Sequence, residues 1–176
     1  MKISVHAVSV ELLANTLANL SHLLEKGHAH AVARKYDPGL LLAARLAPDM
    51  FPLTRQVQIA TDMTKFGVAR LAAVEAPKFE DTEQTFEELR ARIARTIDFI
   101  KGVPASALEG SEDRDIKVPA RDRTLEFKGL QYLIRWVIPN AFFHVTSAYA
   151  ILRASGVELG KSDFLAGSGP GFSQTP

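Results

Sequence analysis

Apolar side chains recur at helical spacing in four long stretches of the chain. In the first stretch, residues 4–25, they lie alternately four and three positions apart and therefore share one helix face. That stripe consists of His6, Val10, Leu13, Leu17, Leu20 and Leu24. We expect Gly27 to end this helix, residues 27–38 to form a connection, and residues 40–46 to form a short helical turn.

The second and third stretches each carry a start signal and a stop signal. The second begins near Pro48 or Pro52 and ends before Pro77, because proline is tolerated in a first helical turn but not within a helix. Its core face consists of Leu53, Val57, Ala60, Met63, Gly67 and Leu71. In the third, Asp81 is the expected N-cap and Gln84 reaches back to it. The apolar stripe of this helix consists of Phe86, Leu89, Ile93, Ile97 and Ile100.

The period of the apolar residues changes to two between the third and fourth stretches. Ile116 and Val118 alternate with charged residues, and Leu125 and Phe127 do so again after a turn-like segment. This alternation predicts a short β-hairpin, which must pack on the helices because two strands alone are only marginally stable.

Helical spacing returns over residues 128–156, where Pro139 in the interior is expected to kink or split the helix. The four stretches together predict an all-α fold, a four-helix bundle with a short β-hairpin insertion before the last helix. We expect one domain over residues 1–165 and a tail rich in Gly, Ser and Pro over residues 166–176.

Composition narrows the functional classes. The chain has 176 residues, a formal net charge of +1 and no cysteine. The near-zero charge gives no electrostatic support for nucleic-acid binding, and the absence of cysteine excludes disulfides, thiolate metal sites and a cysteine nucleophile. No apolar run approaches the roughly 20 residues of a membrane span, and no targeting segment is recognisable. The expectation is a cytoplasmic protein that binds neither nucleic acid nor membrane.

Three polar residues share one face of the otherwise apolar fourth helix. Asn140, His144 and Ser147 are spaced four and three residues apart. Buried polar groups need partners, so this stripe is either a hydrogen-bonded knot in the core or the floor of a small-molecule pocket. In the pocket interpretation His144 is a general base, a hydrogen-bonding hook or a metal ligand, and Asn140 fixes its tautomer. In the other, Asn140 and a backbone carbonyl satisfy the histidine.

Three further residues are candidates for the same pocket. Gln56 lies inside the apolar arc of the second helix, and His6 heads the leucine stripe of the first. The simpler interpretation of His6 is a bundle-end residue with its tip in water. Asp62 shares a polar face with Gln58 and Lys65, and is expected to be an ordinary surface partner of Lys65.

Charged and glycine-containing patterns elsewhere in the chain are weaker indications of a functional site. Glu88 and Arg92 are expected to pair on a solvated face of the third helix. Residues 156–162 resemble a phosphate-binding loop, but the spacing is one residue short and the segment follows a helix rather than a strand. His28 and His30 lie in the expected connection, with no third metal ligand nearby.

Five blocks of the sequence resemble an uncharacterised domain-of-unknown-function family that is grouped with the DinB/YfiT-like superfamily. The blocks are residues 46–53, 56–62, 139–146, 148–153 and 156–165, and together they span most of the chain. The resemblance implies a DinB-like four-helix bundle, often dimeric, with a long crossover between the second and third helices.

The resemblance also bears on whether the protein binds a metal ion. Many superfamily members bind a divalent metal through one histidine on the second helix and an H-x-x-x-H pair on the fourth, and some are thiol-dependent transferases or isomerases. Here only His144 matches that pattern, because Ala148 stands four residues later and residues 48–74 contain no histidine. A catalytic zinc site needs about three protein ligands, so no metal is expected.

Three functional hypotheses remain, and they leave open whether the protein is an enzyme. The first is a DinB-like protein with a closed small-molecule pocket near His144 that lacks the full metal triad. The alternative is a non-catalytic helical module that forms a homodimer through the apolar fourth helix. The second alternative is a metal-dependent transferase or isomerase.

Overall fold

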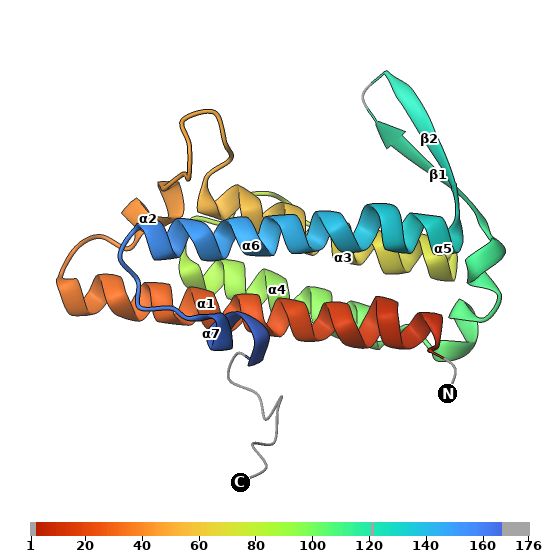
Figure 1. Ribbon diagram of the computed structural model, residues 1–176, viewed down its shortest axis with the longest axis horizontal. Helices are drawn as coiled ribbons and strands as arrows, with labels where there is room; N and C mark the ends of the chain where they lie inside the picture. The colour runs from red at the N-terminus through yellow and green to blue at the C-terminus, as the bar shows by residue number, and fades with distance from the viewer. Residues whose placement is uncertain (1–2, 121, 167–176) are drawn as a thin grey trace, which may run out of the picture.

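Four long helices form the predicted bundle. The computed structural model describes residues 3–120 and 122–166, and every structural statement below concerns those residues. The long helices, which lie side by side in Figure 1, are α1 (Leu12–Arg34), α3 (Leu53–Ala72), α4 (Phe86–Lys101) and α6 (Ile138–Ala154). α1 packs against α4 and α6, and α3 packs against the same two helices from the other side. The predicted all-α four-helix bundle is confirmed.

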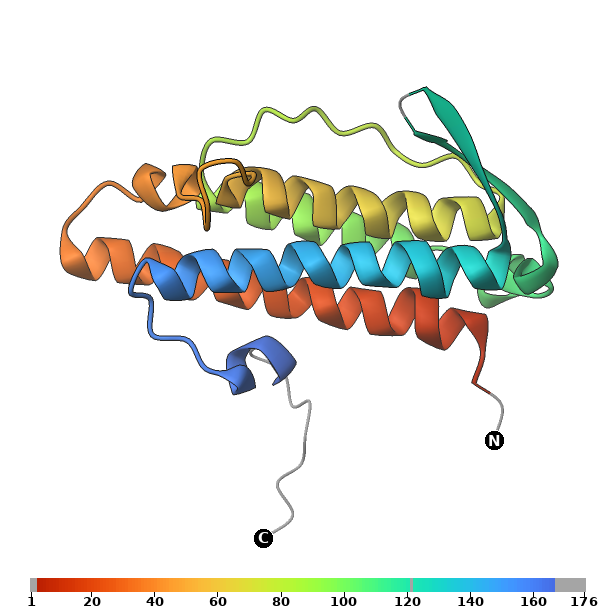
Figure 2. The same cartoon turned by 45° about the horizontal axis from the view of Figure 1, so that its top comes forward.

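The connection between α3 and α4 runs along the length of the bundle. α3 and α4 point in the same direction, so the chain must return before α4 can begin, and Figure 2 shows this crossover along one side of the molecule. Within residues 3–120 and 122–166, no helix combines the length and apolar character that crossing a membrane requires.

The first helix is longer than predicted, because Gly27 lies inside it. A Cβ at Gly27 would lie 2.8 Å from Leu152 Cδ2 and 3.4 Å from Phe86 Cε1, so the glycine permits close helix packing. The helix ends instead at Lys35, whose φ of 59° is left-handed. His28 and His30 therefore belong to α1 and not to a flexible connection. A π-helical turn, η1 (Ala7–Glu11), precedes α1.

The segment between α1 and α3 contains a short helix and a loop that is closed by hydrogen bonds. The short helix α2 (Gly39–Ala43) forms where a helical turn was expected, and residues 44–52 connect it to α3. The backbone N–H of Leu53 donates to the carbonyl of Ala44 at 3.0 Å, and Arg45 donates to the carbonyl of Met50. These bonds fix the loop, which becomes one wall of the candidate site.

The N-terminus of α4 is capped by a different pair from the one predicted. Thr85 is the N-cap: its Oγ1 accepts from the Glu88 N–H at 3.1 Å, and Glu88 Oε2 accepts from the Thr85 N–H at 3.0 Å. This capping box is the T-x-x-E form of the motif, four residues after the predicted Asp81. Because Glu88 is committed to the cap, it is not available for the predicted pair with Arg92.

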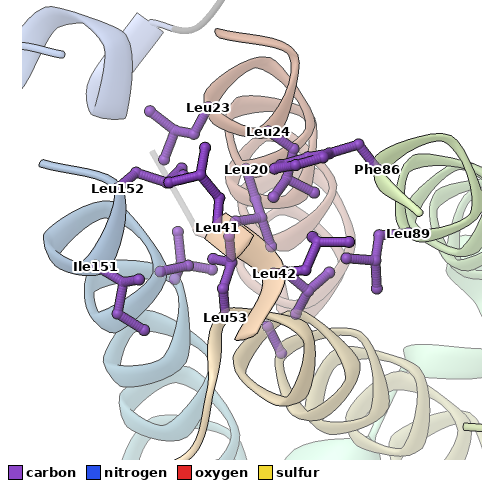
Figure 3. Packing of buried hydrophobic residues seen from close by; sticks show 14 of the residues in the cluster. Leu20, Leu23, Leu24, Leu41, Leu42, Leu53, Phe86, Leu89, Ile151 and Leu152 are labelled. Atoms are coloured by element: carbon purple, nitrogen blue, oxygen red, sulfur yellow. The ribbon is translucent and has the colours of Figure 1, made fainter. Parts of the chain in front are cut away.

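Apolar packing falls into two adjoining clusters. One cluster, drawn in Figure 3, joins α1, α3, α4 and α6 to the short helix α2. Its labelled members are Leu20, Leu23, Leu24, Leu41, Leu42, Leu53, Phe86, Leu89, Ile151 and Leu152. The other cluster fills the opposite half of the bundle and includes Ile116 and Val118 of the hairpin.

The predicted hairpin is present and packs on the bundle through alternate residues. After two 3-10 turns, η2 (Ala105–Leu108) and η3 (Ser111–Asp113), strand β1 (Asp115–Ala120) pairs antiparallel with β2 (Arg123–Lys128). Ile116 and Val118 are buried, whereas their neighbours Asp115 and Lys117 are exposed. The period-two pattern is therefore the pattern of burial.

The last long helix absorbs Pro139 without breaking. α5 (Gly129–Tyr132), the π-helical turn η4 (Leu133–Val137) and α6 follow one another without a gap, and Pro139 is in the first turn of α6. A π turn leaves room for a ring that has no N–H to donate, so the irregularity occurs one turn before the proline.

A short helix that the apolar pattern did not predict follows α6. This helix, α7 (Lys161–Ala166), packs against α1, and the side-chain amide of Asn19 donates to the carbonyls of Phe164 and Leu165. Asp163 Oδ1 lies 2.8 Å from Lys26 Nζ and 3.2 Å from His22 Nε2. Of the predicted tail, residues 167–176 lie outside the described part of the chain.

Candidate functional site

A hydrogen-bonded chain joins the fourth helix of the bundle to the loop before α3. His144 of α6 and Gln56 of α3 are both buried, and His144 Nδ1 lies 2.7 Å from Gln56 Oε1. The amide nitrogen of Gln56 donates to the carbonyl of Phe51 at 3.1 Å. Gln56 therefore holds both the histidine ring and the loop of residues 44–52.

This chain of bonds decides which ring nitrogen of His144 carries the proton. The Phe51 carbonyl can only accept, so the NH₂ group of Gln56 faces it and Oε1 faces the histidine. Because Oε1 can also only accept, His144 Nδ1 must donate, and in the neutral ring Nε2 keeps its lone pair. Burial, together with the positive charge of Arg55, lowers the pKa of His144 below its ordinary value, so the ring is neutral at pH 7.

The two other members of the polar stripe behave differently from each other. Asn140 Nδ2 donates to the carbonyl of Trp136, 2.6 Å away on its own helix, so Gln56 and not Asn140 fixes the tautomer of His144. Ser147 is 6% exposed, and its hydroxyl makes no hydrogen bond with the described residues. Its hydroxyl oxygen is not among the enclosed unpartnered atoms of the described residues, so it is open to a hydrogen bond from outside the fold.

Ser147 lies at the edge of an apolar hollow of about 360 Å³ between the loop of residues 44–52 and α6. Its other lining residues are Leu46, Met50, Phe142, Phe143, Thr146 and Ala150. No charged residue lines the hollow. It is open to the surface, and His144, Asn140 and Gln56 are not part of its lining. A closed cavity lined by those three residues stays a prediction, and this hollow is one helical turn away from it.

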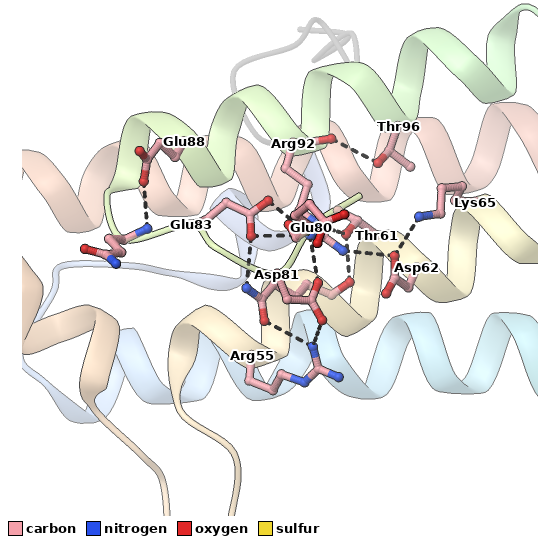
Figure 4. A network of polar contacts seen from close by, with 12 residues as sticks. Arg55, Thr61, Asp62, Lys65, Glu80, Asp81, Glu83, Glu88, Arg92 and Thr96 are labelled. Atoms are coloured by element: carbon pink, nitrogen blue, oxygen red, sulfur yellow. Dashed lines mark hydrogen bonds and ion pairs between the residues drawn. The ribbon is translucent and has the colours of Figure 1, made fainter. Parts of the chain in front are cut away.

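Asp62 belongs to a buried ionic network and not to this hollow. Its Oδ1 lies 2.9 Å from Arg92 Nη2 and 2.9 Å from Lys65 Nζ, and both basic side chains are fully buried. Figure 4 shows how Arg92 reaches from α4 to α3 and to the crossover. The predicted pair between Asp62 and Lys65 forms, but its expected surface location was wrong, because the crossover covers this side of α3.

The network also holds the crossover in place. Arg92 Nη1 lies 2.9 Å from Asp81 Oδ1 and 3.0 Å from Glu83 Oε1, and Phe79 lies against Lys65 with 4.0 Å from Nζ to the ring centroid. We call this cluster the Arg92 network. It contains three cations and three carboxylates: Arg55, Lys65, Arg92, Asp62, Asp81 and Glu83. The charges balance, and the network has a buried centre (Lys65, Arg92 and Glu83) and an exposed edge (Arg55 and Asp81).

His6 is not brought to His144. Its Nδ1 lies 3.5 Å from Glu11 Oε1, and it lines a separate hollow with residues of η2 and the turn after it, including Leu108 and Glu112. That hollow is at the end of the bundle where α1 begins, whereas Gln56 is in the first turn of α3, which starts at the opposite end (Figure 1). The half-buried position of His6 agrees with the simpler interpretation of a bundle-end residue.

Comparison with known proteins places this geometry in a family. The sequence matches the domain of unknown function DUF1993 over residues 5–165. The chain belongs to the DUF1993 family. A DinB family member protein from Shewanella denitrificans, known from its crystal structure, is 40% identical with a TM-score of 0.85, and the match covers 91% of this chain and 90% of that one. No curated protein matches the chain. The predicted DinB-like fold and family are thereby confirmed.

The metal triad found in many DinB-like proteins does not fit the side chains of this DUF1993 member. The described residues contain no cluster of three histidine, cysteine, aspartate or glutamate side chains that could hold a metal ion. Ala148, four residues after His144, is fully buried in the apolar core, and the α3 residue that contacts His144 is the amide Gln56. An alanine and a glutamine that donates to a backbone carbonyl cannot complete a three-ligand site.

A signal for the Arg92 network was present in the sequence of this DUF1993 member. Arg92 falls between Leu89 and Thr96 on the inward stripe of α4, at the spacing of a buried residue. Thr61 and Lys65 of α3 lie on a matching face, and Thr61 Oγ1 accepts from Arg92 Nε at 2.8 Å. A charged residue such as Arg92 on the apolar stripe of one helix, together with a polar face on another helix such as α3, predicts a buried ion pair between the two helices.

Proposed function

We propose that this DUF1993 protein binds a small, uncharged and largely apolar molecule in the hollow between residues 44–52 and α6, without a metal triad. The observation that carries the proposal is Ser147, a residue that is only 6% exposed and that lines an apolar hollow, where its hydroxyl has no hydrogen-bond partner among the described residues. An apolar lining with few polar groups is the usual character of a small-molecule site.

The chemistry of the lining limits the ligand. Phe142, Phe143 and Met50 offer flat or adaptable apolar surface, and the hydroxyls of Thr146 and Ser147 are the polar side chains of the lining. No lining residue can balance a formal charge, so a charged ligand would lose hydration without compensation. The volume of about 360 Å³ is at the lower end of ordinary ligand pockets, which favours a ligand of one or two rings.

The wall formed by the loop is held in place before any ligand arrives. Arg45 binds the Met50 carbonyl, the Leu53 N–H binds the Ala44 carbonyl, and Gln56 binds the Phe51 carbonyl. Preorganisation of this kind lowers the entropic cost of binding. His144 is joined to this wall through Gln56, although it is not among the residues that line the hollow.

A fluorescence thermal-shift screen with uncharged one-ring and two-ring compounds tests the proposal, with hits confirmed by isothermal titration calorimetry. Ala150→Phe places a ring in the hollow and should abolish binding, whereas the matched control Ala154→Phe, on an exposed part of α6 outside the lining, should not. Ser147→Ala should weaken binding. A screen without hits, or hits that bind Ala150→Phe as well as the wild type, would contradict the proposal.

Exposed apolar side chains on α6, on η4 and on the loop before α3 support a second candidate, a homodimer. Phe143 is 58% exposed and Phe51 54%, and Ile134 of η4 is also half exposed. Leu133 and Val137, which contributed to the predicted apolar surface, are instead buried within the bundle. Such a cluster of exposed apolar groups is typical of an interaction surface.

Sedimentation equilibrium at micromolar concentration separates the two candidates. A dimer of the wild type that dissociates in Phe143→Glu would support assembly through this face, and the exposed substitution Thr146→Glu beside it provides a second contact test. A wild type that is monomeric throughout the concentration range would contradict the dimer while leaving small-molecule binding untouched.

A further inference from the structure

We infer that His144 Nε2 is a specificity-determining acceptor for a hydrogen-bond donor on the ligand. The ligand class would then be uncharged apolar or aromatic molecules that carry an N–H or O–H group. This inference rests on the proposed function and specifies the polar end of the ligand that the hollow would take.

Gln56 fixes the tautomer of His144. The Phe51 carbonyl orients Gln56, and Gln56 Oε1 requires a proton on His144 Nδ1, which lies 2.7 Å away. Nε2 is therefore an acceptor and not a donor in the neutral ring. A histidine that is oriented by a carbonyl on one nitrogen presents its other nitrogen for an outside contact, and the same arrangement orients histidines that face ligands in other sites.

His144 Nε2 has no hydrogen-bond partner among the described residues and is not fully enclosed by them. It makes no hydrogen bond with the described residues, in which the fully enclosed side-chain atoms without a partner are Ser9 Oγ and Thr64 Oγ1. His144 Nε2 and Ser147 Oγ are absent from that enclosed set, so each keeps some access to the space outside the fold. Two accessible polar atoms on otherwise buried side chains are available to a ligand.

His144 and Ser147 are close to each other on α6. His144 and Ser147 are three residues apart on α6 and lie on the same helix face, and Ser147 lines the hollow. Because His144 lies outside the lining, a ligand whose apolar body contacts Phe143 must extend its polar end along α6 beyond the hollow to reach Nε2. Arg55, whose positive charge acts on His144, disfavours a cationic donor such as an ammonium group. A neutral donor satisfies these conditions, whereas a carboxylate has no proton to give.

Indole and benzofuran provide a matched pair of test ligands, because they have nearly the same shape and only indole has an N–H. Titration calorimetry at pH 7.5 should give a Kd for indole about tenfold lower than for benzofuran, the effect of one hydrogen bond to a buried acceptor. In His144→Leu the two Kd values should become equal, and in Ser147→Ala indole should keep its advantage.

A second measurement needs no variant. In wild-type protein labelled with ¹⁵N-histidine, indole should shift the Nε2 resonance of His144 and benzofuran should leave it unchanged, and in the free protein the proton should be on Nδ1. Equal binding of both compounds with no change at Nε2 would overturn the inference and leave the proposed function standing. Failure of both compounds to bind the wild type would contradict the proposed function as well.

Discussion

Arg92 of α4 and Asp62 of α3 lie 2.9 Å apart, Nη2 to Oδ1, in an interface where the arginine has no exposed surface. The same guanidinium contacts Asp81 and Glu83 of the crossover. One buried side chain thus joins two helices and the long connection between them, and Phe79 of the crossover lies against Lys65 and Arg92 of the same network.

Replacement of Arg92 by methionine should destabilise the protein by about 3–5 kcal/mol. The substitution keeps the length of the stem, but it leaves Glu83 without its buried cation and Asp62 with Lys65 alone. Urea unfolding followed by circular dichroism measures the loss, and hydrogen exchange should show the crossover, residues 74–84, losing protection first.

The matched control is Arg90→Met on the same helix. Arg90 is 41% exposed at its side chain and lies 3.5 Å from Glu25, so its loss should change the unfolding free energy by no more than about 0.5 kcal/mol. If Arg92→Met were as mild as Arg90→Met, the network would not be what holds the crossover.

Replacement of Gly67 by alanine should also destabilise the protein, for a steric reason. A Cβ at Gly67 would lie 2.5 Å from Val137 Cγ1 and 3.0 Å from Cγ2, so α3 and the π turn η4 would have to separate. Overpacking of this kind costs about 1–3 kcal/mol, of which the better helix propensity of alanine returns about 1 kcal/mol.

A double-mutant cycle with Val137→Ala isolates that contact. The alanine at position 137 removes both methyl groups that the new Cβ would meet, so the two substitutions together should cost less than the sum of their separate effects. Strict additivity would show that the close approach of these two helices is not the cause.

The fold was predictable from the sequence because the apolar period is unambiguous in each long element. Leu13, Leu17, Leu20 and Leu24 are all buried, and the period-two residues Ile116 and Val118 are buried in a hairpin. The predictions that were wrong concern where helices begin and end. Gly27 is a packing glycine and not a stop, and Asp81 binds arginines rather than capping α4.

The candidate site was predictable only in part. The stripe on α6 and the polar Gln56 inside an apolar arc both indicated a buried contact, and His144 and Gln56 do meet. Which polar residue would reach the histidine depended on the axial positions of α3 and α6, which periodicity does not give. The hollow could not be predicted either, because one wall is the loop of residues 44–52, whose path is fixed by backbone hydrogen bonds.

The ion pairs of Asp163 should make the docking of α7 sensitive to acid. Burial alone would raise the pKa of Asp163, but hydrogen bonds from Lys26, Gly160 and His22 outweigh it and lower the pKa from 3.8 to about 2. A lowered pKa means that the stabilisation is complete above about pH 4 and is lost as the pH falls toward 2. The lowering of this pKa from 3.8 to about 2 corresponds to at most about 2.5 kcal/mol.

Asp163→Asn should remove this stabilisation at neutral pH, and hydrogen exchange of residues 161–166 should show it as faster exchange in α7. Glu158→Gln, which removes an exposed carboxylate from the preceding segment, is the matched control and should leave α7 protected. Unchanged exchange in Asp163→Asn would mean that Asn19 and the apolar contact between Phe164 and Tyr149 hold the helix without the ion pairs.

The lowered pKa of His144 predicts an acid sensitivity with a different midpoint from that of Asp163. The buried ring binds a proton less readily than the same ring in the unfolded chain, because burial and Arg55 oppose the charge. The unfolded state therefore takes up more protons as the pH falls below about 6.5, and stability is lost between that pH and the lower pKa of the folded state. Urea unfolding from pH 8 to pH 5 should show this decline in the wild type and a smaller one in His144→Leu.

The preference for indole over benzofuran should disappear over the pH range in which the folded ring takes up its proton, because a protonated Nε2 can no longer accept a hydrogen bond. A stability decline that is identical in His144→Leu would assign the acid sensitivity to other groups, and an indole preference that persists on the protonated ring would exclude Nε2 as the acceptor.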